Sequence, residues 1–474
     1  MSPAMSMTRD LALVLPELLL TGGAVLGLLL GSFLPRHRQW LVRLAAAVVC
    51  AGGLAATVAR WPEERTTVFE GAYAVDVATD AARVIVLVSV LLVLGLAAAD
   101  IDGSPRETEF VVLLLLGALG AVLLAGAADL LLLAAAYLLA SVPLYALTAF
   151  AKDAPGTEAA MKYYLMGALL GVTMLFGLLT LFGTGRATAY AGLADTLPSA
   201  PGAAVAIGAV LFLAGPLFKA GAVPAHFWIP DAAEGARAPV AALLTTIPKI
   251  GAVVAVFRFA DTALAPTTVD WRLLIAVLAA LTMTLGNLAA FFQDNVRRLL
   301  AYSTISQVGY LLMAVAAAGR TPLALTGLLL YLAAYAVTNL GAFAVVAALP
   351  RATTLADYRG LLRANRWLAL ALVVCLLGLV GTPPTGVFAG KLTVFTAALD
   401  AGFAWLVVVA VVNTVASLFY YLRWITPAVR TEPISSDRPS RWPLGIAYLA
   451  AAVSLTIGPL AGPLLTAFDT GLAR

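Results

Sequence analysis

Charged residues are scarce in this sequence. Asp, Glu, Lys and Arg make up only 11% of its 474 residues, whereas 62% are hydrophobic. Soluble globular domains carry about 25% charged residues, so the composition excludes an ordinary soluble protein. Because a bilayer core about 30 Å thick takes roughly 20 apolar residues per helix, the long apolar stretches predict a membrane protein.

Sequence signals for cofactors are also lacking. The two cysteines, Cys50 and Cys375, lie inside apolar stretches without the spacing of metal ligands, and we interpret them as packing residues. The sequence has no Gly-rich phosphate loop, CxxC pair or haem motif, which argues against electron transfer by the chain itself. It therefore predicts no cofactor-binding residue and no metal ligand, and its net charge of +4 requires no nucleic acid partner.

Fourteen apolar stretches of spanning length follow one another along the chain, with short connections. They begin near Leu11, Trp40, Ala81, Glu109, Leu130, Ala160, Ala203, Val240, Trp271, Ala301, Pro322, Arg366, Ala404 and Trp442. This pattern predicts an all-α polytopic membrane protein with about 14 transmembrane helices. The short connections leave no soluble domain large enough for a cofactor.

Basic residues are divided unequally between alternate connections. One side has sixteen: Arg36, Arg38, Arg43, Arg106, Lys152, Arg237, Arg297, Arg298, Arg351, Arg359, Arg363, Arg366, Arg423, Arg430, Arg438 and Arg441. The other side, which includes both termini, has eight: Arg9, Arg60, Arg65, Arg186, Arg258, Arg272, Arg320 and Arg474. Arg83 is assigned to neither side. Because the side richer in Lys and Arg faces the cytoplasm, we expect both termini outside the cytoplasm.

Four of the five lysines fall within apolar stretches: Lys162, Lys219, Lys249 and Lys391. The loops use arginine almost exclusively. Arginine stays protonated, whereas a buried lysine can give up its proton, as a proton carrier must. Any single lysine could instead reach a membrane interface or pair with a buried acid. Four together indicate an ion or proton path through the membrane.

Two of these lysines lie beside similar interruptions, "GPLFKAGAVP" at 215–224 and "GTPPTGVFAGK" at 381–391. Gly and Pro free backbone groups that are tolerated at membrane depth only beside protein or water, so both helices should be broken. The lysines are 172 residues apart, each in about the fourth helix of a five-helix block. This predicts two inverted five-helix repeats, spans 4–8 and 9–13, each forming a half-channel. Ordinary proline kinks are the alternative.

The repeats imply four parts of the chain. Residues 1–108 would hold the first three helices, 109–262 the first half-channel, 263–428 the second half-channel, and 429–474 the last helix.

Several longer motifs resemble a known family. They are "FKAGAVPAHFWIPDAAEGARAPVAALLTTIPKIG" at 218–251, "FFQDNVRRLLAYSTISQVGYLL" at 291–312, "LADYRGL" at 355–361 and the 381–391 motif. The family is that of the antiporter-like membrane subunits of proton-pumping NADH:quinone oxidoreductase, respiratory complex I. The resemblance covers nearly the whole chain and is strongest to subunit N; Mrp-type cation/proton antiporter subunits are related.

The resemblance implies roles for five residues. Lys219 matches the central proton-exchanging lysine of the first half-channel, and Lys249 the lysine that passes protons to the second half. Lys391 matches the lysine that releases or reloads the proton there, while Lys162 matches one that modulates the first. His226 could relay protons from the cytoplasmic side, although a structural hydrogen-bonding role is an alternative.

The resemblance also implies the setting. The chain would be one subunit of a proton-translocating enzyme in the bacterial plasma (inner) membrane, beside antiporter-like and small membrane subunits and in contact with the lipid bilayer. The complex would use NADH, FMN, iron–sulfur clusters and a quinone, none of them bound by this chain.

One position departs from the family. Members usually have a glutamate three residues before the serine of a "SLPLY"-like stretch, paired with the lysine matched by Lys219, but this chain has Leu138 there. Without that negative charge, Lys219 should give up its proton more readily. Asp129 lies nine residues away, about 13 Å along a helix, too far for a direct pair. Glu17 is another intramembrane acid, whose role stays open between packing and an interface.

Leu138 keeps a second hypothesis open. The chain could be a divergent paralogue that serves as a membrane scaffold, or that belongs to another redox complex with impaired pumping. A third hypothesis is an Mrp-type cation/proton antiporter subunit, for which transport would depend on Na⁺ or K⁺.

Overall fold

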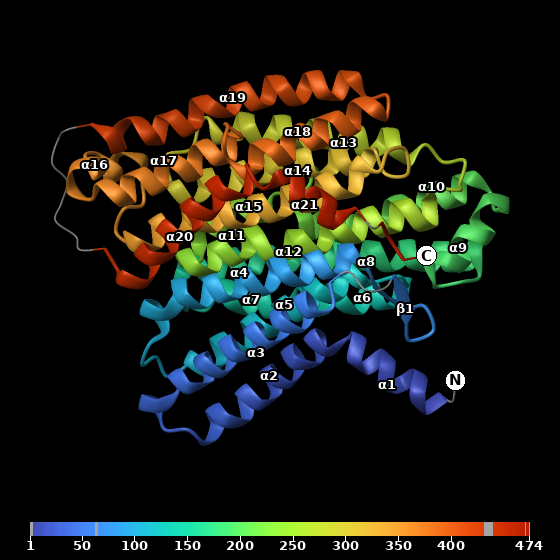
Figure 1. The fold of residues 1–474 in the computed structure, drawn as a ribbon, viewed down its shortest axis with the longest axis horizontal. Coiled ribbons are helices and arrows are strands. Elements are labelled where there is room, and N and C mark those ends of the chain that lie inside the picture. Colours follow the sequence, from blue (N-terminus) through green and yellow to red (C-terminus); the bar gives the residue numbers. More distant parts are fainter. Residues whose placement is uncertain (1–2, 62–64, 431–438, 470, 474) are drawn as a thin grey trace.

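The computed structural model describes residues 3–61, 65–430, 439–469 and 471–473. Two of the arginines counted in predicting the orientation, Arg438 and Arg474, lie outside these ranges. The described chain is almost entirely helical, as the apolar stretches predict, and its long helices run roughly side by side (Figure 1).

The first part of the chain contains helices α1 to α12 and one short hairpin of strands. Their bounds are α1 Pro3–Leu13, α2 Leu15–Phe33, η1 Arg36–Arg38, α3 Trp40–Ala59, β1 Thr66–Val68, β2 Tyr73–Val75, α4 Val77–Ile101, α5 Glu107–Gly126, α6 Leu130–Leu139, α7 Val142–Thr148, α8 Ala154–Gly185, α9 Tyr190–Thr196, η2 Leu197–Ser199, α10 Gly202–Ala220, α11 Trp228–Gly235 and α12 Ala238–Phe259.

The second part continues with η3 and helices α13 to α21. Their bounds are η3 Ala260–Leu264, α13 Trp271–Ala290, α14 Val296–Ala316, α15 Leu323–Ala348, η4 Leu355–Tyr358, α16 Leu361–Ala364, α17 Arg366–Val380, α18 Gly386–Asp400, α19 Ala404–Val429, α20 Arg441–Ile457 and α21 Ala461–Phe468.

Within the described ranges, twelve helical segments are long and apolar enough to cross a membrane, or thirteen if the bent pair α20 and α21 counts as one. The remaining expected span begins with α17, which has 15 residues. At 1.5 Å per residue it is about 22 Å long, short of a 30 Å core. It is short because the chain breaks there and resumes in α18.

Both expected breaks are present. Helix α10 ends at Ala220 and helix α17 at Val380, and the next residue in each case, Gly221 or Gly381, has a left-handed backbone with φ of 88°. A side chain at Gly221 would also overlap Ile229 of α11. Glycine tolerates this conformation without the steric penalty of other residues, so the sequence ends each helix beside its lysine.

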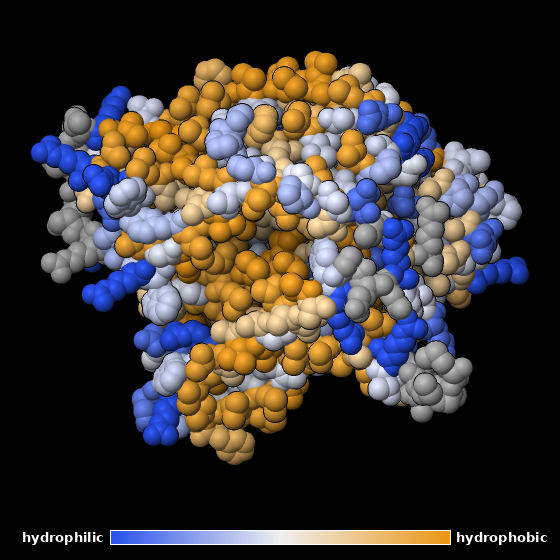
Figure 2. Space-filling view, viewed as in Figure 1, coloured by the Kyte–Doolittle hydropathy of each residue, from blue (hydrophilic) through white to orange (hydrophobic). Residues whose placement is uncertain are grey.

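The surface is that of a membrane protein. A broad hydrophobic band covers the middle of the molecule, and hydrophilic residues gather toward its left and right ends (Figure 2). Both marked chain ends lie at the right-hand end of the helices (Figure 1). The even number of expected spans therefore agrees with the termini lying on one side.

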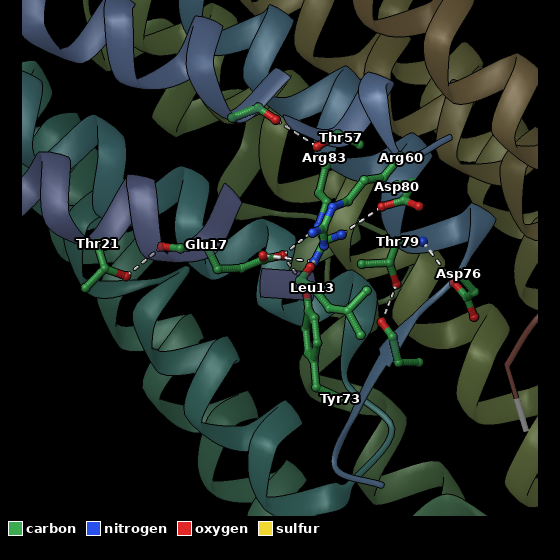
Figure 3. Close-up of polar contacts among 12 residues, drawn as sticks. Leu13, Glu17, Thr21, Thr57, Arg60, Tyr73, Asp76, Thr79, Asp80 and Arg83 are labelled. Atoms are coloured by element: carbon green, nitrogen blue, oxygen red, sulfur yellow. Dashed lines mark hydrogen bonds and ion pairs between the residues drawn. The ribbon is translucent and has the colours of Figure 1, made fainter. Parts of the chain in front are cut away.

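A buried ion pair joins the first spans. The Glu17 carboxylate of α2 accepts hydrogen bonds from Arg83 of α4, at 2.7 Å from Nε and 2.9 Å from Nη2, and from the Tyr73 hydroxyl at 2.5 Å (Figure 3). Arg83 also pairs with Asp80 at 2.7 Å. Glu17 thus has a packing role, tying α2 to α4 and to strand β2.

A second buried pair corrects the orientation argument. Arg258, placed there in a loop, lies within α12 and is 1% exposed. Its Nη1 and Nη2 donate to the two oxygens of Asp76 at 2.6 and 2.8 Å, and Asp76 also accepts from the Ala473 amide at 2.8 Å. The burial is possible because each charge has a partner, so Arg258 is a packing residue that joins α12 to the start of α4.

The 355–361 motif forms a capped turn outside the membrane-spanning segments. The backbone amides of Thr353 and Thr354 donate to the Asp357 carboxylate at 2.9 and 2.8 Å, and Gly360 has a φ of 76°. Partial burial alone would raise the pKa of Asp357, but these hydrogen bonds outweigh it and hold the pKa below its usual value. The turn therefore leads directly into α16, whose N-cap is Gly360.

Candidate functional site

Three of the four candidate lysines are buried. Lys219 on α10 and Lys249 on α12 are 0% exposed, and Lys391 on α18 is 3% exposed. A charged or neutral amine in such surroundings needs hydrogen-bond partners, because an unpaired buried polar group is costly. All three find a backbone carbonyl oxygen.

Lys249 uses a carbonyl that a proline leaves free. Its Nζ lies 3.5 Å from the carbonyl oxygen of Leu244. In a regular helix that oxygen would accept from the amide four residues later, but residue 248 is Pro248, which has no N–H. The proline thus provides an acceptor beside the lysine inside an otherwise continuous helix.

Lys391 uses a carbonyl at the broken end of α17. Its Nζ donates to the Val380 oxygen at 2.9 Å and lies 4.0 Å from the centre of the Tyr310 ring. Helix α17 ends at Val380, so the carbonyls of its last turn have no helical partners. The "GTPPTG" interruption therefore provides the partner of the lysine that follows it.

Lys219 uses the gap between α6 and α7. Its Nζ donates to the Ala140 carbonyl at 3.3 Å. The amide of Leu144, which would bond to that oxygen in a regular helix, bonds to Ser141 instead. The carbonyl is left for the lysine because the fifth span is interrupted at this point.

Aromatic rings enclose the Lys219 amine. Its Nζ lies 5.2 to 5.6 Å from the centres of the rings of Tyr137, Tyr145, Tyr163 and Phe218. It also lies 3.1 Å from the hydroxyl oxygen of Tyr163, to which it donates. Aromatic faces at this distance attract a cation.

One aromatic pair connects Lys219 with Lys249. The Tyr163 ring stacks on the Trp228 ring with centres 3.9 Å apart, and Lys249 Nζ lies 5.5 Å from the centre of the Trp228 ring. Each lysine therefore lies beside one ring of a common stack.

Between Lys249 and the second break lie buried polar side chains in two hydrogen-bonded groups. Thr245, one turn earlier on α12, accepts from Asn339 Nδ2 at 3.0 Å through its hydroxyl oxygen. Tyr335 of α15 donates to the Thr245 carbonyl at 2.7 Å and lies 3.0 Å from the Thr304 hydroxyl oxygen of α14. These groups reach from α12 across to α14 and α15.

The second group of polar side chains reaches the Leu379 carbonyl, next to the Val380 carbonyl that accepts from Lys391. Gln307, three residues after Thr304, donates from Nε2 to the Leu379 oxygen at 2.8 Å and accepts from the Tyr331 hydroxyl. Leu379 lies in the last turn of α17, so its oxygen also has no helical partner. Adjacent carbonyls thus hold Gln307 and Lys391.

Lys162 lies apart from this group. Its side chain is 49% exposed, and it pairs with Glu158 at 2.8 Å and with Asp231 at 3.1 Å. Arg298 pairs with the same Asp231 at 2.7 Å. Lys162 is thus not buried with the other three lysines, and its contacts are with this network of charged side chains.

His226 is buried in the break between α10 and α11. It is 2% exposed, and its Nδ1 has no hydrogen-bond partner among the described residues. The described residues therefore give this nitrogen no partner for a proton relay.

Comparisons with known proteins agree with this architecture. The family described as "NADH:quinone oxidoreductase/Mrp antiporter, TM" matches residues 127–417. The chain is 57% identical to NADH-quinone oxidoreductase subunit N 1 of Streptomyces griseus subsp. griseus over 98% of both chains. It is 52% identical to subunit N of a Mycobacterium species, over 95% of this chain and 97% of the relative. The chain belongs to this family.

Solved structures show the same fold. A chain of respiratory complex I from Thermus thermophilus, determined with bound aureothin, is 33% identical and superposes with a TM-score of 0.83, over 96% of this chain and all of that one. A chain of the Mrp complex from a Dietzia species has a TM-score of 0.86 at 21% identity, with coverages of 98% and 96%. At that identity the second likeness shows the fold alone.

The family's glutamate position faces outward in this chain. Leu138 is 56% exposed and borders a surface cavity of about 250 Å³ with Tyr137 and Tyr145. Asp129 caps the start of α6, accepting from the Leu131 amide at 2.7 Å, and so does not pair with Lys219, as its distance along the helix predicts. The ion pairs found within the described ranges include none between a carboxylate and Lys219.

The neutral part of the site was missed from the sequence. Thr245, Asn339, Tyr335 and Gln307 are all at most 1% exposed, yet none was singled out. The available signal was the run of polar residues "STISQ" at 303–307 within an apolar span. Such residues stand out only when a span is expected to line a polar path rather than face lipid.

Proposed function

We propose that this chain is the proton-translocating subunit N of an NADH:quinone oxidoreductase, and that it moves protons along Lys219, Lys249 and Lys391. The observation that carries the proposal is the placement of three buried amines beside carbonyls freed from helices. The proposal draws support from the subunit N relatives at 57% and 52% identity.

The freed carbonyls suit a lysine that changes its charge. A carbonyl oxygen accepts a hydrogen bond from an ammonium group and equally from a neutral amine, so the side chain is held in both states. It carries no charge of its own, so it does not fix the proton in place as a carboxylate would. Each lysine can then pass its proton on without losing its position.

Neighbouring lysines would influence one another through their charges. At an effective dielectric constant near 20, two unit charges about 8 Å apart interact by roughly 2 kcal/mol. Protonation of Lys249 would therefore disfavour a second charge on Lys219 across the Tyr163–Trp228 stack. A charge change at a neighbouring subunit, driven by quinone reduction elsewhere, would start the sequence.

The polar chain would carry the proton from Lys249 to Lys391. Hydroxyl and amide groups can hand on hydrogen bonds without charging, and Gln307 ends beside the carbonyl that holds Lys391. The two half-channels, 109–262 and 263–428, would meet along these polar side chains. His226 would relay protons into the first half, and Lys162 would act on it through Asp231.

The rest of the complex would supply the redox chemistry. NADH, FMN, iron–sulfur clusters and the quinone would be bound by other subunits, and this chain would bind none of them. Its partners would be neighbouring antiporter-like and small membrane subunits in the bacterial plasma membrane. The side with sixteen basic residues would face the cytoplasm, which places both termini outside it.

The test uses the assembled complex. The chain is tagged in its host, and the complex is isolated in mild detergent and reconstituted into vesicles for NADH-driven proton uptake. Lys219→Ala should reduce uptake without changing subunit composition, whereas Lys152→Ala, at an exposed lysine, should not. Equal uptake in both variants, or a complex without an NADH dehydrogenase module, would favour the scaffold hypothesis. Uptake that requires Na⁺ or K⁺ would favour an antiporter.

A further inference from the structure

We propose that in this chain a cage of aromatic rings, rather than a carboxylate, stabilises the protonated form of Lys219. The cage consists of Tyr137, Tyr145, Tyr163 and Phe218. The inference rests on the proposed function, because it concerns the charge that Lys219 carries during proton transfer. It makes Tyr137, Tyr145 and Tyr163 positioning residues that act through the lysine.

The rings approach the amine from four different helices. Tyr137 lies on α6, Tyr145 on α7, Tyr163 on α8 and Phe218 on α10 beside the lysine itself. All four ring centres lie within 5.6 Å of Nζ. Tyr163 meets the amine through its hydroxyl oxygen at 3.1 Å, so the ring-face attraction concerns the other three rings. The face of an aromatic ring carries negative potential, and its attraction for a cation grows when water is excluded. Lys219 is 0% exposed, so that condition is met.

Helix α8 leaves space for the rings at a glycine. Residue 167 of α8 is Gly167, and a side chain there would overlap the Tyr145 hydroxyl. The Tyr137 hydroxyl donates to the Gly167 carbonyl at 2.8 Å, which turns its ring toward the lysine. The Tyr145 and Tyr163 rings pack edge to face with centres 4.6 Å apart. The cage is thus held by contacts of its own.

The position of the family's acid explains why the cage is needed. Leu138 is exposed, and the side chain that α6 directs at Lys219 is the preceding one, Tyr137. The ionisable groups near the amine are the three tyrosines and the positive Lys249 of α12. No described carboxylate is paired with it. With no negative group at hand, the ring faces favour the ammonium form together with the two oxygens that accept from it, those of Ala140 and Tyr163.

Tyr163 serves both charge states of the lysine. Its hydroxyl oxygen accepts from the ammonium group at 3.1 Å, and its hydroxyl hydrogen can be donated to the lone pair of a neutral amine. Because Tyr163 also stacks on Trp228, the ring beside Lys249, the cage links the two lysines. The charge of Lys219 is then set by neutral groups and by Lys249.

The experiment weakens the negative electrostatic potential of the ring face at residue 137 while nearly keeping the shape of the ring. In the intact complex, residue 137 is replaced by Phe and by Phe carrying one or three ring fluorines, which progressively weaken the negative face. Proton uptake per NADH is then measured in vesicles across a range of pH. Tyr137→Phe, which keeps the ring but loses the hydrogen bond to the Gly167 carbonyl, is the reference to which the fluorinated residues are compared. Fluorination should move the alkaline limit of pumping to lower pH, by up to about one unit, because the ammonium form becomes up to about tenfold less favoured.

Two controls make the outcome decisive. The same fluorinated residues at Phe176, which is 60% exposed on α8, should leave the profile unchanged. Tyr137→Leu removes the ring, and if that variant fails to assemble, the fluorinated series still decides. An alkaline limit that does not move across the series at residue 137 would overturn the cage. Failure of the proposed function would appear separately, as unchanged pumping in Lys219→Ala.

Discussion

Lys391 donates a hydrogen bond to the carbonyl oxygen of Val380 at 2.9 Å, across the break that separates α17 from α18. The oxygen is available because α17 ends at Val380, which leaves the carbonyls of its last turn without helical partners. Beside Lys249 a proline has the same effect inside a continuous helix, because Pro248 cannot donate to the Leu244 oxygen. Each lysine therefore bonds to a carbonyl that its own helix or a neighbouring helix leaves free.

Lys391→Met should stop proton transfer in the second half of the chain. Methionine has a similar length but cannot carry a proton, so proton uptake per NADH in reconstituted complex should fall while NADH:quinone electron transfer continues. Lys152→Met is the matched control because this lysine lies in an exposed connection. Undiminished uptake in a fully assembled Lys391→Met complex would contradict the assignment of this lysine to the path.

Pro248→Ala should separate stability from function. Alanine restores the backbone N–H that bonds to the Leu244 oxygen, and it favours a helix interior over proline by about 3 kcal/mol. The isolated complex should then resist heat at least as well, yet pump less, because Lys249 loses its acceptor. Pro239→Ala is the control, since Pro239 lies in the first turn of α12, where no helical partner is lost. Normal pumping in Pro248→Ala would show that the freed carbonyl is dispensable.

Gly221→Ala should disturb the first break. The residue has a φ of 88°, and a side chain there would overlap Ile229 and come within 3.7 Å of Lys249 Nζ. The left-handed backbone alone costs about 1–2 kcal/mol for a residue other than glycine. Both thermal stability and proton uptake should fall. Gly183→Ala, on the open side of α8 with no atom within 4 Å, should change neither; equal effects of the two changes would argue against a special conformation at Gly221.

Asp76→Ala should weaken the fold by leaving Arg258 buried without its partner. Breaking such a buried pair typically costs about 3–5 kcal/mol, which would appear as a lower temperature of subunit loss from the detergent-solubilised complex. Asp102→Ala removes a pair with Arg43 whose carboxylate side chain is 68% exposed, and it should cost about 1 kcal/mol or less. If the two variants were equally stable, the Asp76–Arg258 pair would not be a packing contact of consequence.

The positions of the spans were predictable because they depend on local composition. Five helices begin at the residues predicted as the starts of apolar stretches: Trp40, Leu130, Trp271, Arg366 and Ala404. Each helix satisfies its own backbone, so length and apolarity decide where it forms. The breaks were predictable for the same reason, because Gly and Pro act on their own helix.

The partners of buried groups were not predictable, because they depend on packing between distant segments. Glu17 and Arg83 are 66 residues apart, and Asp76 and Arg258 are 182 apart. Nothing in the local sequence distinguishes Arg258, a buried partner, from an arginine in a loop. Helix packing alone brings these charges together.

Lys162 shows a different limit, set by helix length. The apolar stretch was expected from about residue 160, but α8 begins at Ala154 and has 32 residues. At 1.5 Å per residue the helix is about 48 Å long, well beyond a 30 Å core. Its first turns can therefore project past the membrane interior, where Lys162 meets Glu158 and Asp231.

Gln307→Leu should interrupt the neutral chain between Lys249 and Lys391. Leucine has a similar size but leaves the Leu379 carbonyl and the Tyr331 hydroxyl without the hydrogen bonds that Gln307 provides. Proton uptake per NADH should fall, whereas electron transfer should persist because no redox group is touched. Gln293→Leu is the matched control, since the Gln293 amide donates only to its own segment, at Ala289. Full uptake in an assembled Gln307→Leu complex would mean that protons reach Lys391 by another route.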